Sequence, residues 1–104
     1  MATKQAVLLI SSYGGNLAQE KNTKKVVDWC EIKKVKVEMV DGADADNRDL
    51  RNTLWGISGS RGYPQMFIKT GDDYAFVGDY DGLEGLIETE TWDAAFDGVE
   101  STEA

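Results

Sequence analysis

After five residues the chain enters the apolar run Ala6-Val7-Leu8-Leu9-Ile10, which gives way at once to the polar, glycine-bearing segment Ser11-Ser12-Tyr13-Gly14-Gly15-Asn16. A continuous apolar run of this length is typical of a central strand that is covered on both faces of its sheet. The polar segment is predicted to be a loop, because glycine and small polar residues interrupt regular structure. These two segments together predict an α/β fold.

A helix follows from about Ala18 to Lys33. Its apolar stripe recurs at offsets of three and four and consists of Val26, Val27, Trp29 and Cys30. From Val35 to Val40 apolar residues then alternate with charged ones, which predicts a half-buried strand. Because a crossover helix joins the two strands, we expect them to be parallel.

A second helix is expected after Asp41-Gly42, with Asp44 or Asp46 accepting the free N–H groups at its start. Its inner face is predicted to carry Leu50, Leu54 and Ile57. The glycine- and serine-rich stretch 56–62, in which Gly56, Ser58, Gly59, Ser60 and Gly62 stand, is predicted to be a flexible joint.

The remaining elements are a hairpin and a third helix. Gln65–Ile68 and Tyr74–Val77 are predicted to be antiparallel strands, joined by the turn residues Thr70–Asp73. Asp81 is the expected N-cap of a helix whose apolar stripe is Leu83, Leu86 and Ile87. Helical spacing from Trp92 to Val99 leaves open a short terminal helix or a frayed tail.

The predicted order is β-α-β-α-β-β-α, and its compact solution is a four-stranded mixed sheet with flanking helices. At 104 residues the chain is expected to be a single domain, 1–104, with a core of about 5–91 and an acidic tail or short helix at 92–104. The apolar runs are too short for a signal-peptide core or a membrane span. One cysteine fits a reducing, cytoplasmic setting.

Charge is distributed unevenly along the chain. The net charge is −8, yet all eleven Lys and Arg residues lie at or before Lys69, and the acids after Lys69 have no basic neighbour in sequence. An acidic surface repels a phosphate backbone, so nucleic-acid binding is not expected. The acidic C-terminal third serves either solubility or contact with a partner.

Composition excludes several kinds of chemistry. The only cysteine is Cys30 and there is no histidine, so an internal disulfide, a Cys/His metal site and a Ser/His mechanism are all excluded. Cys30 lies on the apolar stripe of the first helix, where a thiol behaves as a small hydrophobe. No catalytic residue is predicted, and the sequence indicates a protein that is not an enzyme.

Three features point to a candidate groove at the carboxyl ends of the parallel strands, where ligands of α/β sheets usually bind. They are Tyr63-Pro64 at the start of a strand, Asp79-Tyr80-Asp81 at the start of a helix, and the hydroxyls of Ser11, Ser12 and Tyr13. Local sequence alone favours an ordinary trans proline, whereas for Asp81 a capping role and contact with a ligand both remain open. A helix start of this kind is also a natural carboxylate site.

The motifs resemble those of glutaredoxin-type members of the thioredoxin fold, and more narrowly the SH3-binding, glutamic-acid-rich-like family. Ile10–Asn16 is similar to the loop that replaces Cys-x-x-Cys in that family, and Pro64–Phe67 to its Pro-Pro-Gln-Ile-Phe. Val40-Asp41 with Asn47-Arg48 also resembles the family pattern. Tyr74 with Val77–Asp81 matches its Tyr-x-Gly-Asp-Tyr run most specifically, and the resemblance covers most of residues 6–90.

This resemblance implies a cis peptide at Pro64 and a glutathione-shaped groove, with Asp79–Asp81 on the run that holds the γ-glutamyl end. Gly82 replaces the second acid of that run, and the reactive cysteine position is empty. Lys21, Lys24 or Arg48 would meet the glycine carboxylate of glutathione, unless they are solvated surface residues. With Pro64 as the only proline, the chain has no PxxP ligand for an SH3 domain.

Three functions remain open from the sequence. The first is a redox-inactive module that binds a protein partner of unknown identity through the groove or the acidic C-terminal third. The second is a protein that holds glutathione without chemistry; no other cofactor is expected. The third is an enzyme that uses Cys30 as a lone thiol, which would require that thiol to be exposed.

Overall fold

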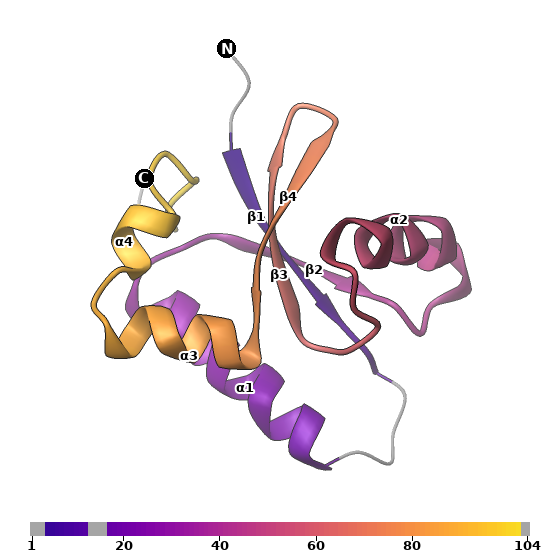
Figure 1. Ribbon diagram of the computed structural model, residues 1–104, viewed down its shortest axis with the longest axis horizontal. Helices are drawn as coiled ribbons and strands as arrows, with labels where there is room; N and C mark the ends of the chain where they lie inside the picture. Colours follow the sequence, from indigo (N-terminus) through magenta and orange to yellow (C-terminus); the bar gives the residue numbers. More distant parts are fainter. Residues whose placement is uncertain (1–3, 13–16, 103–104) are drawn as a thin grey trace.

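The computed structural model describes residues 4–12 and 17–102. Its elements are β1 (Lys4–Ile10), α1 (Leu17–Ile32), β2 (Val37–Asp41), the 3₁₀ turn η1 (Ala45–Asn47), α2 (Arg48–Ser58), β3 (Gln65–Thr70), β4 (Asp73–Asp79), α3 (Tyr80–Glu88) and α4 (Trp92–Ala95), as Figure 1 shows. The predicted order is confirmed, with η1 and α4 added to it.

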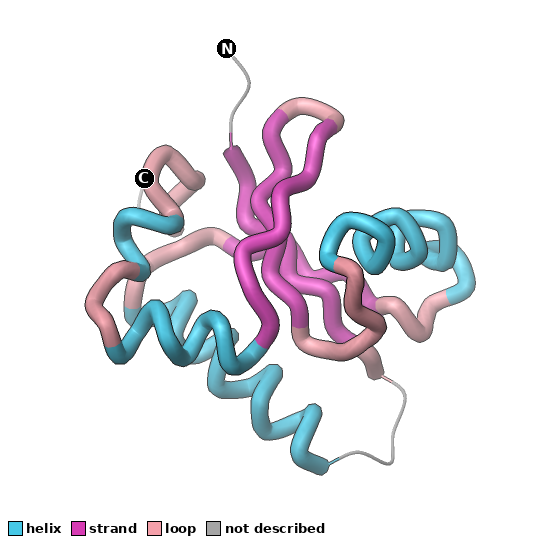
Figure 2. Tube along the Cα trace, viewed as in Figure 1, coloured by secondary structure: helices cyan, strands magenta, loops and turns pink. Residues whose placement is uncertain are grey.

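The strands form one sheet in the order β2-β1-β3-β4. β1 and β2 are parallel, as the crossover helix required, and β3 lies antiparallel to β1 and to its hairpin partner β4. The β3–β4 pairing shifts its register between Met66 and Phe67. The expected four-stranded mixed sheet with flanking helices is therefore present, and the tube in Figure 2 shows its strands gathered between the helices.

Helices cover both faces of the sheet, so β1 is buried on both sides. Ala6 and Leu8 face a core shared with α1, α3 and α4, whereas Val7 and Leu9 face a smaller core that contains Leu54 of α2. In Figure 1, α2 accordingly stands on one side of the strands and the other three helices on the opposite side. Each fully buried aliphatic side chain of this kind contributes about 1.5–3 kcal/mol.

The second helix is longer than the sequence indicates. Gly56 and Ser58, predicted to lie in a flexible joint, are part of α2, which ends at Ser58 and has Gly59 as its C-cap with a φ of 73°. That left-handed conformation is one that glycine adopts at little cost, so Gly59 is the stop signal. The expected capping of this helix by Asp44 or Asp46 was wrong, because its N-cap is Asn47, which makes no side-chain cap bond; Asp44 instead caps η1 by accepting the N–H of Asp46. Ile57, expected on the inner face, is 44% exposed.

The strand after α1 also differs in extent from its prediction. β2 begins at Val37, and Val35 pairs instead with Ser101 in an isolated bridge. The segment 99–102 lies between the beginning of β1 and residues 34–36, since Glu100 N–H donates to Lys4 O and Lys36 N–H donates to Glu100 O, each at 3.0 Å. The end of the chain, as far as Thr102, is thus hydrogen-bonded into the fold.

The terminal segment, for which the sequence left open a short helix or a frayed tail, forms a short helix that is anchored to the core. α4 spans only Trp92–Ala95, yet Trp92 is 1% exposed and stacks on Phe96 at a centroid distance of 4.5 Å. Both rings belong to the larger core. In the described ranges 4–12 and 17–102, no helix combines the length and the apolar character needed to cross a membrane.

Candidate functional site

Most of the predicted groove residues line one hollow, which we call the Pro64 hollow. It lies where the start of β3, the end of β4 and the start of α3 meet, with α1 beside them, and its volume is about 150 Å³. Its lining residues are Asn22, Ser60, Gly62, Tyr63, Pro64, Gln65, Asp79, Tyr80 and Asp81.

Pro64 enters β3 through a cis Tyr63–Pro64 peptide bond, the isomer that the family resemblance implies and that local sequence alone does not favour. Gln65, which follows it, is 1% exposed and donates its Nε2 hydrogens to Ser60 O and Gly62 O at 3.1 and 2.8 Å. These two bonds hold the loop that precedes the strand. The Oε1 atom of Gln65 has no hydrogen-bond partner among the described residues.

The start of α3 forms the opposite side of the Pro64 hollow. The N-cap is Asp79 and not Asp81, because the Asp79 carboxylate accepts the N–H of Gly82 at 3.0 Å. The prediction for Asp81 was therefore wrong: helical geometry already begins at Tyr80, which places Asp81 in the first turn. Asp81 is exposed at the rim of the hollow.

Tyr80 is fixed by contacts on both ends of its side chain. Its hydroxyl donates to Glu84 Oε2 at 3.1 Å, one turn along α3. Its ring stacks on Trp29 of α1 at a centroid distance of 5.6 Å, and Trp29 in turn meets Trp92 edge-on at 6.5 Å. The wall of the hollow that Tyr80 provides is thus supported by packed aromatic rings.

The loop after β1 does not reach the Pro64 hollow within the described residues. Asp41 Oδ1 accepts the N–H groups of Ser12 and Ala43 at 3.0 and 2.9 Å, and the Ser12 hydroxyl is the largest contributor that lowers the pKa of the Asp41 carboxyl. Ser12 is therefore held at the end of β2, and neither Ser11 nor Ser12 is among the described residues that line the Pro64 hollow. Tyr13 lies outside the described residues.

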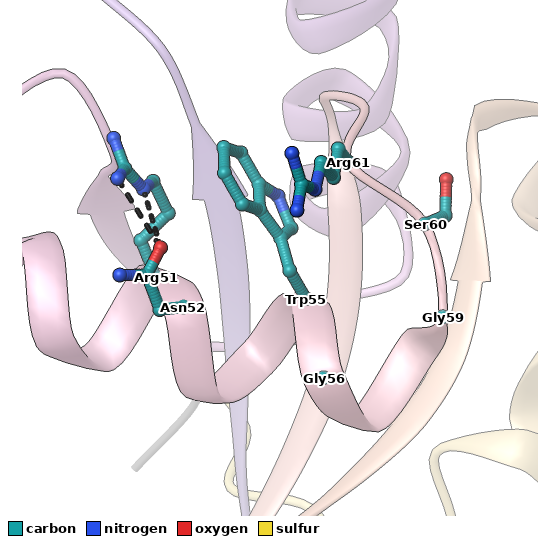
Figure 3. Close-up of a pocket in the computed structure, with 7 residues that line it drawn as sticks. All are labelled: Arg51, Asn52, Trp55, Gly56, Gly59, Ser60 and Arg61. Carbon is teal, nitrogen blue, oxygen red and sulfur yellow. Dashed lines mark hydrogen bonds between the residues drawn. The ribbon is translucent and has the colours of Figure 1, made fainter.

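A second hollow, which we call the arginine hollow, adjoins the first through Ser60 and was not predicted. Its volume is about 510 Å³. In Figure 3, Trp55 stands between Arg51 and Arg61. The full lining set is Arg51, Asn52, Trp55, Gly56, Gly59, Ser60 and Arg61. The sequence signal for it was the i, i+4 spacing of Arg51 and Trp55, which places both on one face of α2.

Tyr63 connects the two hollows. Its ring lies 5.7 Å from that of Trp55, and its hydroxyl packs so closely on Gly42 that a Cβ there would lie 2.5 Å from the oxygen. Burial raises the pKa of the Tyr63 hydroxyl, and the nearby Arg51 guanidinium works in the opposite direction. Arg51 itself lies over the Trp55 ring at 4.6 Å and donates to Gly42 O at 3.2 Å.

Asn22, which lines the Pro64 hollow, was also not predicted, although its spacing in the sequence indicates its position. It precedes Val26 and Cys30 at intervals of four and so lies on the same face of α1, one turn nearer to the site. By contrast, Lys21, Lys24 and Arg48 are exposed and line neither hollow.

Cys30 lines neither hollow, and its thiol is not reactive. It is 1% exposed in the larger core, and burial raises the pKa of its thiol to about 12. Such a thiol is protonated at neutral pH and is a poor nucleophile. Across the described part of the chain, no group of three or more Cys, Asp or Glu side chains is arranged to hold a metal ion.

No protein-family model matches the chain, and no curated protein matches it by sequence. Solved structures do match. A buckwheat glutaredoxin in complex with glutathione has a TM-score of 0.65 at 15% identity, over 88% of this chain and 76% of that one. A mutated buckwheat glutaredoxin has a TM-score of 0.65 at 12% identity, over 91% and 81%.

Glutaredoxin C1 from Populus tremula x tremuloides, solved in its holo form, has a TM-score of 0.63 at 14% identity, over 86% of this chain and 80% of that one. At this level of identity the likeness concerns the fold. Together with the sheet order and the helices on both faces, it shows that the chain has the glutaredoxin-like form of the thioredoxin fold.

Proposed function

We propose that this protein is a redox-inactive glutaredoxin-like module that binds an extended segment of a protein partner at the Pro64 hollow. The observation that carries the proposal is that the only thiol does not lie in the candidate binding site. Tyr63, Pro64, Asp79, Tyr80 and Asp81 line one hollow, whereas the only thiol is buried in the core with its pKa raised to about 12. A hollow without a nucleophile supports a binding role rather than redox chemistry.

The backbone at the hollow supports recognition of an extended peptide. Neither the N–H nor the carbonyl of Tyr63 forms a hydrogen bond with another described residue. Free main-chain groups next to a strand can pair with a partner chain in the way that an added strand does. The start of α3 offers a second contact, because the exposed Asp81 carboxylate can pair with a basic group of the partner.

The size of the hollow favours a peptide over an enclosed small molecule. Small-molecule sites usually have volumes of about 300–1,000 Å³, and the described lining of the Pro64 hollow encloses about 150 Å³. A shallow hollow of this size suits one or two side chains of a segment that runs across the surface. The rigid Tyr80 ring provides the flat wall against which such a side chain would pack.

The finer family assignment, to the SH3-binding, glutamic-acid-rich-like proteins, is part of this proposal. It is supported by Tyr74 with Val77–Asp81, by Pro64–Phe67 and by the single cysteine, which also suits a reducing cytoplasmic setting. Pro64 is the only proline, so a PxxP route to an SH3 domain does not form part of it.

The test is a quantitative capture of partners from cell extract by the native protein and by Tyr63→Ala and Asp81→Ala variants. Arg48→Ala serves as the control, since Arg48 is exposed and lines neither hollow. We expect at least one partner to be depleted about tenfold or more by both groove variants and to be unaffected by the control. Capture that is equally insensitive to all three changes would remove the basis of the proposal.

A second candidate function is the binding of glutathione without chemistry. It is favoured by the structural match to a glutaredoxin that was solved with glutathione, which covers 88% of this chain. Titration of reduced glutathione, followed by NMR at the amides of Tyr63, Gln65 and Asp81, distinguishes the two. Saturable chemical-shift changes at all three amides support glutathione binding. Unchanged shifts at millimolar glutathione would exclude it and leave peptide binding as the remaining candidate.

A further inference from the structure

The arginine hollow has a charge opposite to that of the protein as a whole. The chain carries a net charge of −8, yet the hollow is lined by two arginines and by no acidic residue. Neither Arg51 nor Arg61 forms a salt bridge with a described residue. Two guanidinium groups that line one hollow without a counter-ion repel each other, and an anion bound there would offset that repulsion.

The hydrogen-bond donors in this hollow are only partly used. Arg51 donates hydrogen bonds from Nε and Nη2 to Asn52 Oδ1, at 3.3 and 3.2 Å, and from Nη1 to Gly42 O. Because Asn52 presents its oxygen to Arg51, its amide N–H₂ is the group that remains. Arg61 is exposed and has no hydrogen bond to another described residue, so all of its N–H groups are available.

Trp55 contributes an apolar surface and an indole N–H without a partner. Its indole Nε1 is buried and has no hydrogen-bond partner among the described residues, a situation that is costly for a polar group. Figure 3 shows the indole rising between the two arginine side chains, above the helix that carries Gly56 and ends at Gly59. The two glycines leave the floor beneath the ring uncovered by side chains.

We propose that the arginine hollow binds a phosphate monoester group. A monoester carries a charge of about −1.5 to −2 at neutral pH and three acceptor oxygens. Two guanidinium groups match that charge, and the free donors of Arg51, Arg61 and Asn52 match the oxygens. The organic part of the ester lies against Trp55. This site adjoins the Pro64 hollow, with which it shares Ser60, but its arginines do not line that hollow, and its test does not depend on the outcome of partner capture.

The experiment follows the indole N–H signal of Trp55 by NMR at constant ionic strength, with Trp55→Phe used to assign it among the three tryptophans. The probes are phenyl phosphate, inorganic phosphate and acetate. We expect saturable shifts with phenyl phosphate, weaker binding of inorganic phosphate, and binding of acetate that is weaker by about tenfold or more. Arg51→Gln and Arg61→Gln should each lower the affinity for phenyl phosphate by at least about fivefold.

Arg48→Gln is the matched control, because it removes the same charge from the same helix outside the hollow. Urea unfolding of every variant separates lost binding from lost folding. The proposal is overturned if no signal saturates, if acetate binds as tightly as phenyl phosphate, or if Arg48→Gln weakens binding as much as Arg61→Gln. Equal affinity for inorganic phosphate and phenyl phosphate would overturn the assignment to an ester.

Discussion

Native Cys30 should react with a thiol reagent at least about a thousandfold more slowly than the same residue in the unfolded chain. Burial raises the pKa of its thiol from 9.0 to about 12, which lowers the thiolate fraction at neutral pH by about three powers of ten. The side chain is also only 1% exposed, so reagent access adds to this protection.

Opening of the whole fold gives a second route to the thiol, and it is comparably slow. If the free energy of unfolding is about 5 kcal/mol, the open form amounts to roughly one molecule in several thousand. Both routes therefore predict that folding slows the reaction of Cys30 by at least about a thousandfold. The assay compares the rate of colour development with a disulfide reagent at pH 7.5 in buffer and in concentrated urea.

Two variants calibrate this measurement. Cys30→Ser should give no signal, and Ser12→Cys in the Cys30→Ser background should label rapidly, because residue 12 is exposed. If native Cys30 labelled within tenfold of the unfolded rate, the assignment of the thiol to the core would be wrong, and a single-cysteine enzyme would again be a serious candidate.

Three further predictions concern stability, each followed by urea unfolding. Trp92→Ala should cost about 3–5 kcal/mol, since it empties a fully buried site; a loss below about 1 kcal/mol would show that α4 is not anchored. Asp79→Ala should cost about 0.5–2 kcal/mol through loss of the α3 N-cap, and Asp81→Ala less than about 0.5 kcal/mol; the reverse order would contradict the capping assignment. Because the folded pKa of Asp41 is lowered, its contribution is present above the unfolded pKa of about 3.9 and lost as pH falls through the folded value. Asp41→Asn should therefore differ from the native protein at pH 7 by a small amount, and this difference should shrink below pH 4; a constant difference would argue against the linkage.

The sheet could be predicted because its signals are local. The run from Ala6 to Ile10 is apolar throughout since both faces of β1 are covered, and the turn at residues 70–73 fixes the hairpin. The order of the remaining elements then follows from chain connectivity.

The ends of the elements were harder to predict because they depend on tertiary contacts. Asp79 and Asp81 are both good capping residues in sequence, and only the end of β4 decides which one lies at the cap position. Gly56 looked like part of a joint, but the burial of Leu54 carries the helix through it to Gly59. Helix propensities do not include the contribution of such tertiary packing.

The candidate site was predicted in part for a similar reason. Tyr63, Pro64 and Asp79–Asp81 were found because each belongs to a motif with a local signal. The arginine hollow was missed because its members come together only when the end of α2 turns back at Gly59 and brings Arg61 beside Trp55. Neither arginine is distinguishable in sequence from a solvated surface residue.

The segment 99–102 has a consequence for how the protein is made. Lys4 lies at the start of the chain's first strand, yet its carbonyl, the Lys34 carbonyl and the Lys36 N–H bond to Glu100 and Thr102, which are made much later. Contacts of such large sequence separation form late in folding. Until residues 99–102 have been made, the backbone groups beside Lys4 and residues 34–36 lack the hydrogen bonds that this segment supplies, so a chain that stops before residue 99 leaves an unfinished margin beside the sheet.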